Sequence, residues 1–188
     1  MNTLTAMNLA TGEKKGFNIT VKSLIDSSNL TKYYKNASQY NVKVYNKDGS
    51  LAVNKSVTFN INGVFYNRTS DGNGIVTLNI NLRPGNYTII TIHEDLDVGN
   101  HVEVLPTLIT NDLTMSYKDG STFDVTVLDG KGHPIIGEKV IFNVNGIFYY
   151  KITDLKGVAK LNINLLKGEY IITSYWKDYE VGNKITIV

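Results

Sequence analysis

The sequence predicts an all-β protein of tandem immunoglobulin-like β-sandwich domains, about seven strands each, and three observations lead to this fold class. The segment 57–66 returns as 140–149, and further matches keep the same spacing of 83 residues. Apolar residues alternate with polar ones in 140–144 and 161–165, which is the period of a strand with one buried face. Turn signals separate these runs, and the Asn-Gly pair at 145–146 is typical of a two-residue hairpin loop. A repeat of this length is one small domain, so we expect an array.

The repeat divides the 188 residues into two complete domains, expected at 30–105 and 113–188. A short linker, 106–112, contains one proline and little glycine, which favours a semi-rigid joint. Residues 1–29 match the end of a repeat at the same spacing, so they are expected to be the last two strands of a partial upstream repeat, followed by a linker. This match suggests that the natural protein continues upstream.

The strands of the second repeat follow one another in chain order. Alternating runs cover 123–127, 140–144 and 161–165, and they are rich in β-branched and aromatic residues. The sixth strand begins at Tyr170, after a tight Lys-Gly turn, and Asn183 opens the last strand. Glycine- or aspartate-containing turns between these runs are consistent with a sandwich of short antiparallel strands.

A tyrosine follows the turn before the sixth strand in both repeats. Tyr87 and Tyr170 occupy this position at identical spacing. Immunoglobulin-like sandwiches keep a tyrosine corner here, in which the phenol binds backbone near the preceding strand. We therefore predict that Tyr87 and Tyr170 are structural.

Composition excludes several classes of function. The net charge is +2, from 19 Lys and Arg against 17 Asp and Glu, without a basic run, so no nucleic-acid partner is predicted. The absence of cysteine removes disulfides and thiolate catalysis. No apolar stretch approaches the roughly 18 residues needed to cross a bilayer, so no membrane insertion is expected in this segment.

The residues at 30–40, 59–66 and 78–87 resemble the immunoglobulin-like repeats of adhesin-like surface proteins of methanogenic archaea. These repeats are similar to bacterial Ig-like domains of the invasin/intimin type, whose turn of the Thr-Asp-x-x-Gly type appears here at 153–157, and at 70–74 with Ser70 in the first position. The resemblance covers nearly the whole chain. It implies a location at the cell surface, as part of a larger exported protein, and partners among glycans or proteins on other cells and neighbouring repeats of the same chain.

No constellation of residues predicts an enzyme or a cofactor. His93, His101 and His133 have no nucleophile at matching spacing and are expected to be surface histidines. Calcium at the joint would use Asn111 and Asp112 with a loop acid such as Glu94 or Asp95. The dense acidic motif of such sites is missing, which favours a plain polar linker without metal.

A Lys–Asn amide crosslink would have to join one of two repeated pairs of residues, Lys35 with Asn100 or Lys118 with Asn183. If the first and last strands run parallel, the two side chains of a pair lie at opposite ends of the strands, about 16 Å apart. This geometry argues against a crosslink.

Six asparagines meet the Asn-x-Ser/Thr pattern for glycosylation, and all precede residue 89. These candidates are Asn18, Asn29, Asn36, Asn54, Asn67 and Asn86.

Aromatic residues distinguish the second repeat near the connection of its last two strands. Tyr175, Trp176 and Tyr179 stand where the first repeat has no aromatic residue. They could stack on a sugar or anchor a protein, although we favour the alternative that some of these rings cap the core.

The leading hypothesis is a structural and adhesive stalk module that projects and stiffens the array and gives weak multivalent attachment. The alternative hypothesis is a dedicated glycan- or protein-binding module that uses the loop 175–180.

Overall fold

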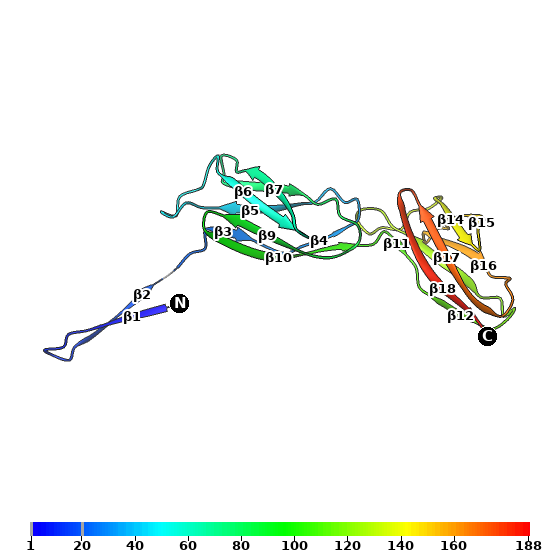
Figure 1. Ribbon diagram of the computed structural model, residues 1–188, viewed down its shortest axis with the longest axis horizontal. Helices are drawn as coiled ribbons and strands as arrows, with labels where there is room; N and C mark the ends of the chain where they lie inside the picture. Colours follow the sequence, from blue (N-terminus) through cyan, green and yellow to red (C-terminus); the bar gives the residue numbers. More distant parts are fainter. Residues whose placement is uncertain (1, 20) are drawn as a thin grey trace. The chain divides into compact units, whose positions relative to one another are not determined.

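The computed structural model describes residues 2–19 and 21–188, and all of the regular structure in these ranges is β-strand (Figure 1). An N-terminal hairpin of β1 (Asn2–Met7) and β2 (Lys14–Ile19) precedes two β-sandwiches. The first sandwich contains β3 (Ile25–Ser27), β4 (Leu30–Tyr33), β5 (Gln39–Val44), β6 (Ser56–Ile61), β7 (Val64–Thr69), β8 (Ile75–Asn79), β9 (Gly85–His93) and β10 (Leu96–Leu105). The second contains β11 (Leu108–Ile109), β12 (Leu113–Met115), β13 (Thr122–Val127), β14 (Lys139–Val144), β15 (Ile147–Ile152), β16 (Val158–Asn162), β17 (Gly168–Trp176) and β18 (Tyr179–Ile187).

Each sandwich consists of a five-stranded and a three-stranded sheet. In the first, the strand orders are β4-β10-β9-β6-β7 and β3-β5-β8; in the second, they are β12-β18-β17-β14-β15 and β11-β13-β16. The two sandwiches therefore match strand for strand, as the 83-residue repeat requires. The prediction of tandem immunoglobulin-like sandwiches is confirmed.

Alternating residues build the core of each sandwich. On β14, Val140, Phe142 and Val144 are buried, whereas the residues between them are partly exposed. Phe142 meets Phe123 of β13 edge to face, with the ring centroids 6.2 Å apart. In the first sandwich, Phe59 meets Tyr40 in the same way at 5.9 Å. The alternate apolar residues of each strand form the core because they lie on the face of their sheet that packs against the other sheet.

The Asn-Gly hairpin turns form as predicted. Asn145 and Gly146 connect β14 to β15 with φ angles of 52° and 80°, and Asn62 and Gly63 repeat this with 52° and 79°. Positive φ at both positions is what a type I′ turn requires, and asparagine followed by glycine tolerates it.

The first strand of each sandwich is divided between the two sheets, which gives eight strands instead of the seven expected. β3 pairs antiparallel with β5 and β11 with β13, but β4 and β12 pair parallel with the last strands β10 and β18. β3 therefore lies within residues 1–29 and β11 within 106–112, so the segments expected to be linkers contribute to the sheets. The alternation of apolar and polar residues does not reveal β3 and β11, because these strands have only three and two residues.

Candidate functional site

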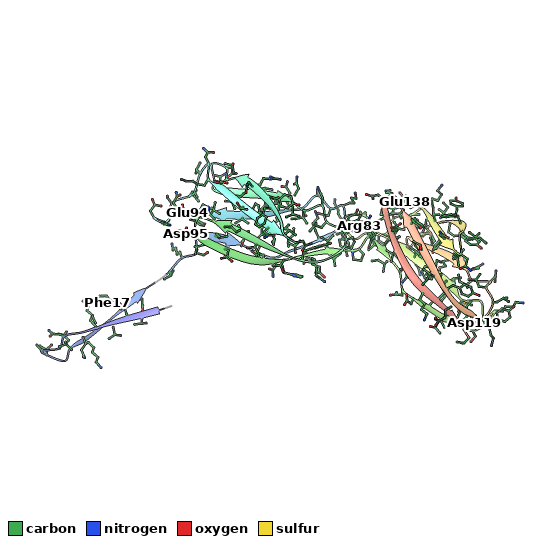
Figure 2. All side chains as sticks on the ribbon, viewed as in Figure 1. Phe17, Arg83, Glu94, Asp95, Asp119 and Glu138 are labelled. Carbon is green, nitrogen blue, oxygen red and sulfur yellow. The ribbon has the colours of Figure 1, made fainter. Side chains whose placement is uncertain are left out.

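The expected aromatic site does not form one exposed surface, because its residues point to opposite sides of the sheet. Trp176 and Tyr179 are paired at the ends of β17 and β18, next to the turn at Lys177. Trp176 is only 8% exposed and belongs to the core, and Tyr179 packs against that core. The indole Nε1–H of Trp176 donates to Oε2 of Glu138 at 3.0 Å (Glu138 is labelled in Figure 2). Trp176 is therefore part of the core, as the favoured alternative of core-capping rings expects.

Tyr175 lies on the opposite face of β17, in an aromatic row across the five-stranded sheet. It pairs with Ile141 of β14, which in turn pairs with Tyr150 of β15. Phe148 lies on the same face two residues before Tyr150, and these four residues line a shallow, open hollow together with Lys177. We name Ile141, Phe148, Tyr150 and Tyr175 the aromatic face. Its rings are the exposed aromatic surface that stacking on a ligand requires.

Two lysines border the aromatic face. The Nζ of Lys139 lies 5.3 Å from the centroid of the Tyr150 ring. Lys177 lines the hollow of this face, and its Nζ lies 4.3 Å from the centroid of the Trp176 ring on the other side of β17. These distances are within the range of cation–π attraction. Lys177 also approaches Glu138 at 3.7 Å. The face is therefore apolar at its centre and cationic at its border.

The first sandwich lacks this aromatic face. The residues that stand 83 positions earlier are Thr58, Phe65, Asn67 and Ile92, and only Phe65 is aromatic. The Thr58 hydroxyl donates to Oδ1 of Asn67 at 2.8 Å across β6 and β7. Comparison of the two repeats position by position could have revealed the aromatic face, but its members are far apart in the sequence and only the strand register brings them together.

The tyrosine at the start of the sixth strand has a defined partner in the second sandwich. The Tyr170 hydroxyl donates to the carbonyl oxygen of Leu166 at 2.9 Å, which is the backbone contact of a tyrosine corner. Tyr87 occupies the same place at the start of β9 and is half-buried. The bond of Tyr170 agrees with the predicted structural role, and the role of Tyr87 stays a prediction.

Asn100 and Asn183 hold the division of the first strand in place. The Ser27 hydroxyl donates to Oδ1 of Asn100 at 2.6 Å, and the Thr110 hydroxyl donates to Oδ1 of Asn183. The Nδ2 of Asn183 donates to Asp112 at 3.1 Å. Each asparagine thus binds the segment where the chain passes from one sheet to the other.

Lys35 and Lys118 lie beyond the ends of β4 and β12, each with a positive φ. The strands of each pair run parallel, as the argument against a crosslink assumed. The side chain of Lys118 extends over the Tyr117 ring at 5.2 Å from its centroid. Asn183, by contrast, pairs in the structure with Thr110 and Asp112.

The acids considered for calcium have partners within the chain. Oδ1 of Asp112 accepts from the backbone N–H of Lys184 at 2.9 Å and from Asn183, and these two bonds lower the pKa of Asp112. Glu94 and Asp95, labelled in Figure 2, both approach Nζ of Lys47, at 3.4 and 3.2 Å. Within residues 2–19 and 21–188, no group of three or more His, Cys, Asp or Glu side chains could hold a metal ion.

One histidine differs from the surface position expected of it. His93 is 2% exposed at the end of β9, with Nε2 at 3.2 Å from the carbonyl oxygen of Tyr45. Its counterpart in the second repeat is the buried Trp176. The interpretation of His93 as a surface histidine is therefore wrong, because this inward position on the strand faces the core. His101 and His133 are exposed.

A buried lysine was missed by the sequence analysis. Lys32 of β4 is 6% exposed, and its ammonium donates to the carbonyl oxygens of Ser38 and Ile80, both at 2.9 Å. Burial lowers the pKa of Lys32. Its counterpart in the second repeat is the buried Met115, so comparison of the repeats could have identified it.

Most of the glycosylation candidates are accessible. Asn18, Asn29, Asn54, Asn67 and Asn86 are exposed, whereas Asn36 is partly buried. Thr20, the third residue of the Asn18 pattern, lies outside the described residues.

The Thr-Asp-x-x-Gly turn has an architectural role. The Thr153 hydroxyl donates to the carbonyl oxygen of Ile135 at 2.7 Å and accepts from the backbone N–H of Glu138 at 2.9 Å. Oδ1 of Asp154 accepts the backbone N–H groups of Val158 and Lys156, and these bonds lower its pKa. The motif therefore fixes two loops of the scaffold.

Comparison with known proteins finds similarity only among solved structures. No known family profile matches, and no curated protein matches. Among solved structures, the chain is similar to the I9–I11 tandem of titin, at 19% identity and a TM-score of 0.38, over 87% of this chain and 65% of that one. It is also similar to invasin, a bacterial integrin-binding protein, at 17% identity and a TM-score of 0.39, over 90% of this chain and 40% of that one. The chain thus spans less than two thirds of the length of either. In the part of the chain that the structure describes, no helix is long and apolar enough to cross a membrane.

Proposed function

We propose that this chain is a structural and adhesive stalk module of a cell-surface, adhesin-like protein of the kind found in methanogenic archaea. The observation that carries the proposal is the parallel pairing of first and last strands, β4 with β10 and β12 with β18. Because such strands run in the same direction, the chain enters each sandwich at one end and leaves at the other. Each added repeat then lengthens the array instead of folding it back.

The parallel pairs also suit a module that bears tension. Pulling on the two ends of a sandwich loads the hydrogen bonds between β12 and β18 in shear, so they resist together. The pair is extended by bonds from the N–H of Val188 to the oxygen of Met115 and from the N–H of Tyr117 to the oxygen of Val188, both 3.0 Å.

Single-molecule stretching of the chain from its termini tests the stalk role. We expect two separate unfolding events, each releasing roughly 25 nm of chain at about 3.5 Å per residue. Tyr117→Pro removes the N–H that binds Val188 and should lower the force of one event only, which leaves the event of the first sandwich as an internal control. A smooth extension without separate events would contradict the proposal.

A second candidate function, a glycan- or protein-binding module, is supported by the aromatic face. The site proposed is then this face and not the loop 175–180, because Trp176 is buried. Its test is a pull-down of cells and cell-wall glycans with Tyr175→Ser, using Ile92→Ser in the first sandwich as the matched control. Saturable binding that only Tyr175→Ser removes would favour recognition, whereas absence of binding would leave the stalk role.

We also propose that the exposed Asn-x-Ser/Thr sites, all of which precede residue 89, carry glycans if the protein is exported. Their exposure supports this proposal. Intact mass measurement of protein from its natural source, before and after glycan removal, would decide it.

A further inference from the structure

We infer that β15 is a self-association strand: it pairs antiparallel with β15 of a second copy of this chain, about a two-fold axis at Tyr150. The two five-stranded sheets then become one continuous sheet of ten strands. This inference does not depend on the stalk role, since it rests on the exposed edge strand of a sheet and not on how the repeats are linked.

The strand β15 lies at the edge of its sheet, next to β14 only. It has six residues without proline or glycine, and Lys151 is its one charged residue. Phe148, Tyr150 and Ile152 are 52%, 60% and 58% exposed. Sheet edges present unpaired backbone N–H and C=O groups, and natural proteins usually protect them with charges, prolines or bulges. An apolar edge strand of this length is therefore suited to pairing.

The hairpin geometry determines which backbone groups of β15 are available. The two-residue turn makes Val144 and Ile147 a hydrogen-bonded pair. Backbone direction alternates along a strand, so Ile147, Tyr149 and Lys151 bond to β14. The N–H and C=O groups of Phe148, Tyr150 and Ile152 consequently point away from the sheet, toward an incoming strand.

An antiparallel copy of β15 centred on Tyr150 uses all of these groups. In this register Phe148 faces Ile152 of the second copy, Tyr150 faces its own counterpart, and Ile152 faces Phe148. All three outward-pointing residues then form hydrogen-bonded pairs. The segment is thus its own complement, which a two-fold interface requires.

The side chains agree with the same register. On the outer face, Phe148 meets Ile152 and Tyr150 meets Tyr150, and aromatic and β-branched cross-strand pairs are favourable. On the other face, Lys151 comes opposite Tyr149, where a cation–π contact can form. The aromatic face therefore continues from one copy into the next.

The first sandwich shows how the same edge is protected when it does not pair. In β7 the residues matching Tyr150, Lys151 and Ile152 are Asn67, Arg68 and Thr69. The carbonyl of Asn67 is one of the outward-pointing groups of that edge, and Nη1 of Arg68 donates to it at 2.8 Å. One repeat thus protects the edge with its own guanidinium, and the other presents an apolar edge. This contrast supports pairing at the β15 edge, and the self-complementary register identifies the occupant as a second copy of β15.

The expected interface is small, because one strand pair buries less than the roughly 1,200 Å² of a stable complex. We expect a dissociation constant of roughly 0.1–1 mM for the isolated chain. In an array of repeats, weak contacts of this kind act together and raise the avidity.

Sedimentation equilibrium of the 188-residue chain, combined with amide hydrogen exchange by NMR, tests the inference. We expect a reversible dimer, in which rising concentration protects the amides of Phe148, Tyr150 and Ile152. The amides of Tyr149 and Lys151 already bond to β14, so their protection should not depend on concentration.

Tyr150→Pro removes one outward N–H, and an edge strand tolerates proline at such a position. We expect it to weaken the dimer by about tenfold or more, whereas the matched variant Asn67→Pro leaves it unchanged. Ile152→Lys, which keeps every backbone group, should weaken dimerisation similarly and covers the case in which the proline variant does not fold. A monomer throughout the concentration range would overturn the inference, as would a dimer that is equally strong in Ile152→Lys or protection at residues outside β15.

Discussion

Removal of the Phe142 ring should strongly destabilise the second sandwich and leave the stability of the first unchanged. Phe142 is fully buried, and its ring meets Phe123 at 6.2 Å. Replacement of a buried phenylalanine by alanine costs about 3–5 kcal/mol. A domain of this size has about 4–12 kcal/mol of stability in total, at 0.05–0.15 kcal/mol per residue. Phe142→Ala should therefore remove a large part of the stability of its own domain.

The single tryptophan makes the assay specific. Trp176 lies in the core of the second sandwich, so its fluorescence in urea reports the unfolding of that sandwich, whereas circular dichroism reports both. With an m-value of about 1 kcal/mol per molar urea, Phe142→Ala should lower the fluorescence midpoint by about 3–5 M or leave the domain unfolded in water. The matched variant Phe59→Ala removes the ring that meets Tyr40 in the first sandwich. It should lower the circular dichroism signal at low urea and leave the fluorescence transition in place. If Phe59→Ala moved the fluorescence midpoint as far as Phe142→Ala, the idea of two separate folding units would be refuted.

Three further predictions concern the scaffold. Tyr170→Phe removes the bond to the Leu166 carbonyl and should lower the free energy of unfolding by about 0.5–1.5 kcal/mol; an unchanged urea midpoint of tryptophan fluorescence would show that this bond contributes nothing. Burial lowers the folded-state pKa of Lys32 below its ordinary 10.5, so the unfolded chain holds its proton to higher pH. The stability of the first sandwich should then rise with pH from that lowered pKa up to about 10.5, and Lys32→Met should abolish the rise in urea titrations followed by circular dichroism; a rise that persists in the variant would assign it to another group. Gly157→Ala places a Cβ at 3.0 Å from the Val127 oxygen with φ at +73°, so it should destabilise by about 1–3 kcal/mol, and a neutral effect in thermal unfolding would mean that the loop shifts to accept it.

Much of the fold follows from local sequence patterns, namely the alternation of apolar and polar residues and the turn residues. Alternation on β14 predicts which of its residues are buried, because side chains on a strand point to opposite faces in turn. The Asn145-Gly146 turn is predicted by its need for positive φ at both positions. The division of the first strand between the two sheets was not predicted, because strands of two or three residues are too short to show an alternating pattern. The bonds from Asn183 to Thr110 and Asp112, which hold that division, join residues more than 70 positions apart.

The candidate site, too, could not be predicted from residues that are close together in the sequence. Tyr175 and Trp176 are neighbours in the sequence and were considered together as one candidate site, but adjacent residues of a strand face opposite sides of the sheet. Tyr175 instead joins Ile141 and Tyr150, through the register of three strands.

The sequence by itself determined the repeat, its strands and its turns, since these depend on residues close together in the chain. Only the tertiary structure decided which side chains meet across the sheets, that His93 and Lys32 are buried, and that β15 is an edge strand. Those properties depend on strand order and register, which arise when distant segments pair and bury their apolar faces against each other.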